Sequence, residues 1–152
     1  MHVGHGASVF VTDGCKALFL RNEGDSDFPD LRLLQRWEQS VPPDREFKSS
    51  GPGRSFGSYG QGSRRSSYQE TNFHALAEAE FAAHAAEFLN EKVQGDGIEK
   101  LIIVAPPRTL GLVRKGLRRE AEQVVFAEIP KDLVKHPVWK IEQLLTTYPE
   151  PS

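Results

Sequence analysis

A short apolar run in the last third of the chain constrains the fold most. Residues 100–105 read KLIIVA, and Pro106 and Pro107 end the run. Apolar residues without polar alternation predict a strand buried on both faces, as in a parallel sheet covered by helices. We therefore expect an α/β domain in which Lys100 to Ala105 lies at or near the centre of the sheet.

A second run, VVFAEI from Val124 to Ile129, predicts another strand of the same kind, also at or near the centre. Between the two runs, Pro107 suits the first turn of a helix that extends from Arg108 to about Arg118. Strands joined through a helix in this way run parallel, and the connection is right-handed. The two runs therefore predict one parallel pair.

The N-terminal third predicts three antiparallel strands. Residues 7–12 and 17–21 are β-branched, aromatic or aliphatic, and they flank Asp13-Gly14, a strong hairpin turn signal. Residues 31–39 alternate imperfectly, so we expect a third strand there, with a helix as the alternative. Pro42 and Pro43 end this element, because proline removes a ladder donor.

Two more helices follow from apolar spacing. Thr71 or Asn72 can cap a long helix that ends near Gln94, before Gly95-Asp96-Gly97. A last helix is expected over Val138 to Leu145. The predicted core includes Val9, Val11, Leu18, Leu20, Phe81, Phe88, Ile102, Val104, Val125 and Trp139.

The order of elements predicts the architecture. The chain has 152 residues, enough for one domain with a real core, and we expect residues 1–152 to form it. The order β-β-β-α-β-α-β-α predicts a five-stranded mixed sheet flanked by helices. A ribonuclease H-like layout has this same order.

A long basic segment interrupts this pattern at about residues 42–70. It is rich in Gly and Ser, and no acidic residue lies between Glu46 and Glu70. Neither hydrophobic period fits it, so we expect a loop that is mobile from about Lys48 to Tyr68 when unbound. It is either a flexible, solvated insertion or a nucleic-acid-binding loop. In the second interpretation, arginines neutralise phosphates and aromatic rings stack on bases, which selects Arg54, Phe56, Tyr59, Arg64 and Arg65.

Composition excludes several classes. The net charge of −2 argues against a uniformly basic coat for nucleic acid. The single cysteine, Cys15, excludes an internal disulfide, and its place in a turn favours a turn residue over a nucleophile. No apolar run is long enough to span a membrane, and the first residues do not form a secretion signal. We therefore expect a cytoplasmic protein without a membrane partner.

The candidate catalytic and ligand-binding residues indicate a protein that uses neither a metal nor a cofactor. Ribonuclease H chemistry needs several carboxylates on two metal ions, and ASVFVT, the first predicted strand, holds none. The chain has no phosphate-binding Walker loop and no zinc spacing, so we expect no metal and no cofactor. His74 and Glu78, one helical turn apart, are expected to orient the loop. A second polar cluster is expected at strand carboxyl ends, where open sheets bind ligands. It consists of Arg108, Lys131, Lys135 and His136.

Four segments resemble a known family: DGCKALFLRNEGD, PPDRE…GPGR, LIIVAPPRTLGLVRK and EIPKDLVKHPVWKIEQLL. Together they are similar to the bacterial host-attachment family, described as required for attachment to host cells. That family is similar in fold to the middle domain of archaeal and eukaryotic peptide-chain release factors. There a Gly-Gly-Gln loop, rich in Gly and Arg, precedes a long helix.

The corresponding stretch here is residues 59–65, YGQGSRR, in which Tyr59 stands in place of the first glycine. The resemblance implies Gln61 as the residue that would position a water molecule on an ester. Three functions follow as hypotheses. The first is an accessory factor that binds RNA, tRNA or the ribosome through its basic loop. The others are a protein-interaction factor for host attachment, without RNA binding, and a peptidyl-tRNA ester hydrolase. We expect a binding protein rather than an enzyme.

Overall fold

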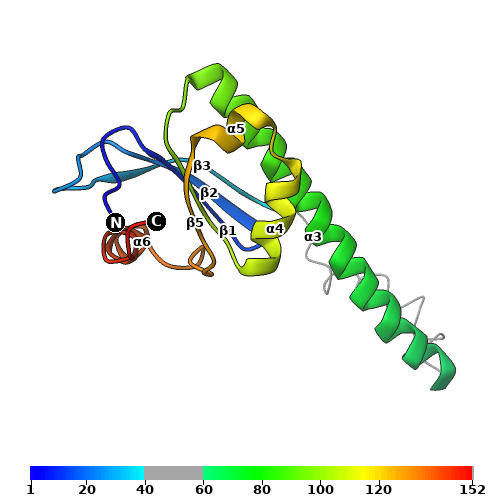
Figure 1. Ribbon diagram of the computed structural model, residues 1–152. Coiled ribbons are helices and arrows are strands. Elements are labelled where there is room, and N and C mark those ends of the chain that lie inside the picture. The colour runs from blue at the N-terminus through cyan, green and yellow to red at the C-terminus, as the bar shows by residue number, and fades with distance from the viewer. Residues whose placement is uncertain (40–59, 152) are drawn as a thin grey trace.

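The computed structural model describes residues 1–39 and 60–151, with the side chains of residues 60–74 left out of the description. The elements follow the predicted order, with one short helix added before the last strand (Figure 1). They are β1 (Ser8–Thr12), β2 (Lys16–Asn22), β3 (Leu31–Glu38), α3 (Gly60–Asp96), β4 (Leu101–Val104), α4 (Pro107–Gly116), α5 (Arg119–Val124), β5 (Val125–Ile129) and α6 (Val138–Thr146).

The five strands form one mixed sheet in the order β3-β2-β1-β4-β5. β1 pairs antiparallel with β2 and parallel with β4, so Val9 faces both Leu20 and Ile102. β2 pairs antiparallel with β3, and β4 pairs parallel with β5. The predicted fold class, an α/β domain with a five-stranded mixed sheet flanked by helices, is therefore confirmed.

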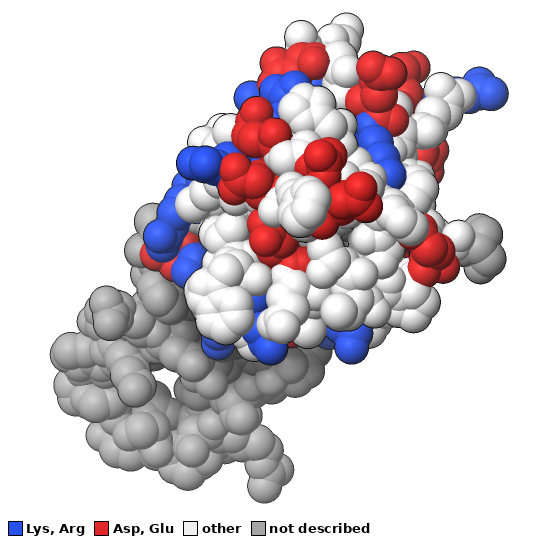
Figure 2. All heavy atoms as spheres, turned by 90° about the vertical axis from the view of Figure 1, so that its left-hand side faces the viewer, with Lys and Arg blue, Asp and Glu red and all other residues white. Residues whose placement is uncertain are grey.

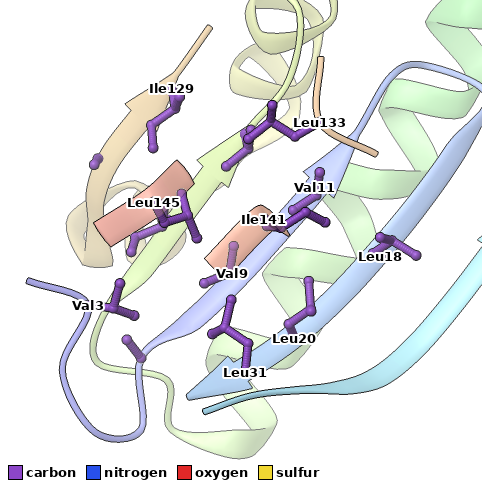
Figure 3. Close-up of a cluster of buried hydrophobic side chains, with 14 of the residues drawn as sticks. Val3, Val9, Val11, Leu18, Leu20, Leu31, Ile129, Leu133, Ile141 and Leu145 are labelled. Carbon is purple, nitrogen blue, oxygen red and sulfur yellow. The ribbon is translucent and has the colours of Figure 1, made fainter. Parts of the chain in front are cut away.

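Each face of the sheet has its own apolar core. On one face, α6 packs Ile141 and Leu145 against strand residues that include Val9 and Leu20 (Figure 3). On the other face, α3, α4 and α5 cover Phe10 and neighbouring residues (Figure 1). Central strands that are covered on both sides need apolar residues at every position, which explains why β1 and β4 hold no charged residue.

Aromatic rings fill the core beneath α3. The Phe88 ring lies 4.7 Å from the Trp37 ring and 5.2 Å from the Phe19 ring, the latter edge-to-face. Such pairs add about 0.5–1.5 kcal/mol beyond the area they bury. They join the end of β3 to the middle of α3, and so help to fix the direction of the helix.

The predicted core is largely confirmed, with one error. Val9, Val11, Leu18, Leu20, Phe81, Ile102 and Val104 are buried. Phe88 and Val125 are half-buried. Trp139 is wrong, because 66% of it is exposed on the outer side of α6. The inner side of that short helix is filled by Ile141 and Leu145, which leaves no space for an indole ring there.

Two predicted boundaries are also corrected. α3 begins at Gly60 and not at Thr71 or Asn72, so residues 60–70 are helical rather than part of a loop. The stretch holds Gln, Arg and Glu, which favour helix, and no proline, so a helix that is already formed downstream can extend through it. The expected mobility of residues 48–59 falls outside the described residues.

β5 is the second correction. It is an edge strand and not a central one, whereas β4 lies next to β1 as expected. Its second residue, Phe126, is 36% exposed. An apolar run indicates only that a strand is covered, and helices such as α5 and α6 can provide that cover. The run therefore does not distinguish a central strand from a covered edge strand.

The contact between α3 and α4 generates a test. A methyl group on Gly116 would come within 2.6 Å of the Ala86 side chain, whereas one on Gly111 of the same helix would meet nothing within 4 Å. We expect Gly116→Ala to lower the free energy of unfolding by about 1–3 kcal/mol through overpacking. The control, Gly111→Ala, should raise it by about 0.5–1 kcal/mol. Urea unfolding measures both, and equal stability of the two variants would contradict this packing.

Candidate functional site

The long helix α3 extends well beyond the sheet (Figure 1). It leads into the amino end of β4, so its own N-terminus lies at the carboxyl edge of the parallel strands. Among the described side chains of the helix, which begin at Ala75, the first buried one is Phe81. Residues 60–77, which we call the arm, therefore reach about 25 Å past the domain, at 1.5 Å per residue.

The base of the arm rests on the hairpin turn between β1 and β2. Asp13 accepts hydrogen bonds from the backbone N–H groups of Cys15 and Lys16, each 2.9 Å long, which hold the turn. Gly14 adopts a positive φ of 94°, and a Cβ there would lie 3.1 Å from the Glu78 side chain. The turn can approach the helix this closely because position 14 is a glycine.

Glu78 links the arm to α4 as well. One of its carboxylate oxygens lies 3.0 Å from Nε of Arg108, the second residue of α4. Gln39, just after β3, donates a hydrogen bond of 2.9 Å to the backbone carbonyl of Ala77. The Arg108 side chain is 69% exposed, so the pair contributes only about 0.2–1 kcal/mol. These contacts lie where the arm joins the rest of α3, and they connect the helix to three other segments.

The pKa of the Cys15 thiol depends on the charges around the base of the arm. Partial burial raises the pKa of the Cys15 thiol, and the negative charges of Asp13 and Glu78 raise it further, while Lys135 lowers it. The thiol is therefore protonated near neutral pH and is a weak nucleophile. This agrees with the interpretation of Cys15 as a turn residue.

The second polar cluster lies where the sequence predicts it, at the ends of β4 and β5, but its members do not act as one group. Arg108 pairs with Glu78, and the positive charge of Lys135 acts on the pKa of the Cys15 thiol in the hairpin turn. Lys131 instead lines a shallow cavity of about 250 Å³ together with α6 residues such as Leu144. His136 is exposed, and no ion pair involves it among the described residues.

The remaining predicted residues are placed only in part. Arg54, Phe56 and Tyr59 lie outside the described residues. Gln61, Arg64 and Arg65 belong to the arm, and His74 lies one turn before Glu78, but only the backbone of these four is described. The predicted role of His74 and Glu78 in orienting the segment stays a prediction. Sequence analysis identified Gly14 only as a turn residue, and it missed Gln39 and Thr109 at the base. The Thr109 hydroxyl would lie 3.3 Å from a Cβ on Gly14.

Charge is unevenly distributed over the molecule. Between Glu46 and Glu70 lie four of the 19 Lys and Arg residues and none of the 21 Asp and Glu, so the rest of the chain carries a net charge of −6. The face opposite the arm shows many acidic side chains (Figure 2). The loop between β2 and β3 alone carries four acidic residues, at positions 23, 25, 27 and 30. That face would repel phosphates, whereas the sequence of the arm attracts them.

Metal and membrane sites find no support in the described part of the chain. No three His, Cys, Asp or Glu side chains there form a group that could hold a metal ion. Over the same residues, no helix combines the length and the apolar character that a membrane span requires.

The charge on Glu78 generates a test at the base of the arm. Glu78→Gln removes a negative charge that raises the pKa of Cys15, so the thiolate fraction near neutral pH should rise. We expect faster labelling of Cys15, the only cysteine, by a thiol reagent, and a rate–pH profile moved to lower pH. The matched control, Glu80→Gln, should leave the profile unchanged. An unchanged profile in both variants would show that Glu78 does not face the turn.

Three comparisons with known proteins bear on this arrangement. The model of bacterial archaeo-eukaryotic release factor family 12 matches residues 7–145. The sequence matches no curated protein. Among solved structures, a crystal structure of the archaeal translation termination factor aRF1 is similar over 92% of this chain, with 12% identity and a TM-score of 0.41. The chain spans 35% of the length of that factor. A similarity this low adds no weight to the family match.

Proposed function

The chain belongs to bacterial archaeo-eukaryotic release factor family 12, and from this premise we propose that it acts in translation. In this proposal it is a cytoplasmic accessory factor that binds RNA, tRNA or the ribosome through its basic segment and the arm. The observation that carries the proposal is the arm itself, a helix that leaves the carboxyl edge with the basic sequence at its far end.

The physical argument rests on reach and charge. Arg64 and Arg65 stand in the outer half of the arm, and Arg54 precedes it in sequence. Guanidinium groups bind phosphates, and the rings of Phe56 and Tyr59 offer faces on which bases can stack. A narrow helix can enter an RNA-lined cleft that the domain itself could not enter. Glu78 and its neighbours would hold the base of the arm during that contact.

A release-factor-like hydrolase is the second candidate, and one observation favours it. Gly60-Gln61-Gly62 lies at the very start of α3, at the far end of the arm. A glutamine at such a tip could orient a water molecule on the ester of peptidyl-tRNA. Host attachment through a protein partner is the remaining alternative, and it needs no RNA affinity at all.

The binding proposal predicts the effect of removing two arm charges. Arg64→Ala/Arg65→Ala should weaken binding to ribosomes or tRNA about tenfold at low salt. The slope of log affinity against log salt should become shallower by about 1.4–1.8, because two phosphate contacts are lost. Stability should not fall, since alanine favours helix more than arginine. Co-sedimentation across a salt series measures the slope.

The control removes the same charge elsewhere. Arg118→Ala/Arg119→Ala changes two exposed arginines at the start of α5 and should preserve the salt slope. Equal affinity of the arm variant and the wild type would contradict the arm as the contact. If the wild type has no affinity for ribosomes or tRNA at low salt, the protein-interaction alternative gains instead.

Gln61→Ala separates binding from hydrolysis. If Gln61 orients a water molecule, single-turnover hydrolysis of peptidyl-tRNA should fall by roughly 100-fold or more while binding survives. Gln69→Ala, the same change elsewhere on the arm, is the control and should preserve any activity. Wild-type protein that binds tRNA but releases no peptide would exclude the hydrolase and leave the binding proposal intact.

A further inference from the structure

A second cavity lies at the opposite edge of the sheet from the arm. It has a volume of about 350 Å³ and is bounded by the amino ends of β1 and β4, the end of β2 and the last residues of α3. This volume falls within the range of sites for small molecules. Phe19, Leu34 and Ile98 form its apolar lining.

Ser8 provides a largely buried polar group in the wall of this cavity. The residue is only 3% exposed, on a strand whose other positions are apolar except for Thr12. Its hydroxyl makes no hydrogen bond to any described residue. Among the described residues, however, every side-chain oxygen that is fully shielded from solvent has a hydrogen-bond partner. The hydroxyl must therefore open into the cavity that Ser8 lines. Water can bond to a hydroxyl that opens into the cavity, and a polar atom of a ligand would take the place of that water.

The charged groups around the cavity have both signs. Arg21 lies on one side, and its guanidinium is 3.8 Å from the Glu23 carboxylate, too far for a hydrogen bond to occupy it. Asp96 and Glu99 lie at the C-terminal end of α3 and just after it, and Lys92 pairs with Asp96 at 3.3 Å. Lys100 also lines the cavity, and its ammonium group donates a hydrogen bond of 3.0 Å to the backbone carbonyl of His2. The last carbonyl groups of a helix attract a cation, and a guanidinium binds a carboxylate.

We propose that this cavity binds a small zwitterion with an apolar side chain, which is the chemistry of a free α-amino acid. The carboxylate of the ligand meets Arg21, and its ammonium group meets Asp96, Glu99 and the end of α3. Ser8 bonds to a polar atom of the ligand, and the side chain of the ligand packs on Phe19, Leu34 and Ile98. The proposal is independent of RNA binding by the arm.

L-leucine is the probe for the test, measured by isothermal titration calorimetry and by the melting temperature of the full chain. L-leucine should bind and raise the melting temperature. Isovalerate lacks the ammonium group and isoamylamine lacks the carboxylate, so each should bind at least tenfold more weakly. Binding of isovalerate as tight as that of L-leucine would overturn the zwitterion assignment. Absence of heat and of any thermal shift with L-leucine would overturn the site.

Two variants locate the site. Ser8→Ala should weaken L-leucine binding roughly three- to tenfold, while the ligand-free protein melts at nearly the same temperature because the hydroxyl bonds to no described residue. Arg21→Gln should weaken binding about tenfold or more. Arg32→Gln is the control, since Arg32 lies opposite Arg21 on β3, pairs with Asp30 and does not line the cavity. Unchanged affinity in Ser8→Ala and Arg21→Gln would place any binding elsewhere.

Discussion

The parallel pairing of β1 with β4 is the constraint on which the rest of the structure depends. Every residue of both strands is buried, so the pair requires cover on both faces. The helices α3, α4 and α5 supply one cover and α6 supplies the other. Because β1 and β4 point the same way, their carboxyl ends meet at one edge, where the hairpin turn and the start of α4 lie side by side. The helix that precedes β4 must then begin beyond this edge, which is where the arm lies.

The elements of the fold that could be predicted from the sequence are those that depend on a few neighbouring residues. The hairpin was predictable because Asp13-Gly14 fixes the turn, and β4 because its apolar run ends at two prolines. The start of α3 was predicted too late because Gly and Ser have low helix propensity. The helix that forms downstream can nevertheless extend through these residues. The edge position of β5 and the exposure of Trp139 depend on which neighbours cover each element, and single-sequence periodicity does not contain that information.

The candidate sites divide in the same way. Glu78 was identified from its spacing to His74, but its partner Arg108 had been assigned to a separate cluster, because nothing in the sequence says that α4 begins beside the turn. Ser8 gave no signal at all. A serine within an apolar strand is common, and only the burial of its residue together with the absence of a partner distinguishes it.

The two edges of the sheet are poorly suited to adding another strand. The β2–β3 ladder has a register shift, and β3 carries Arg32, Arg36 and Glu38. The β4–β5 ladder is shifted as well, and β5 has only five residues. Bulges, charges and short strands all discourage pairing at an edge. Partners are therefore expected at the ends of the strands, where the arm and the cavity lie, rather than along the sides of the sheet.

The length of the arm also resolves an electrostatic conflict. Apart from the basic segment, the chain carries a net charge of −6, which would oppose contact with RNA. Salt at physiological concentration screens charges over about 8 Å, and the arm reaches about 25 Å past the domain. At three screening lengths, the acids of the domain contribute little to the field at the arm's tip. A nearly neutral protein can in this way present a locally basic surface, provided that the helix keeps that surface away from the domain.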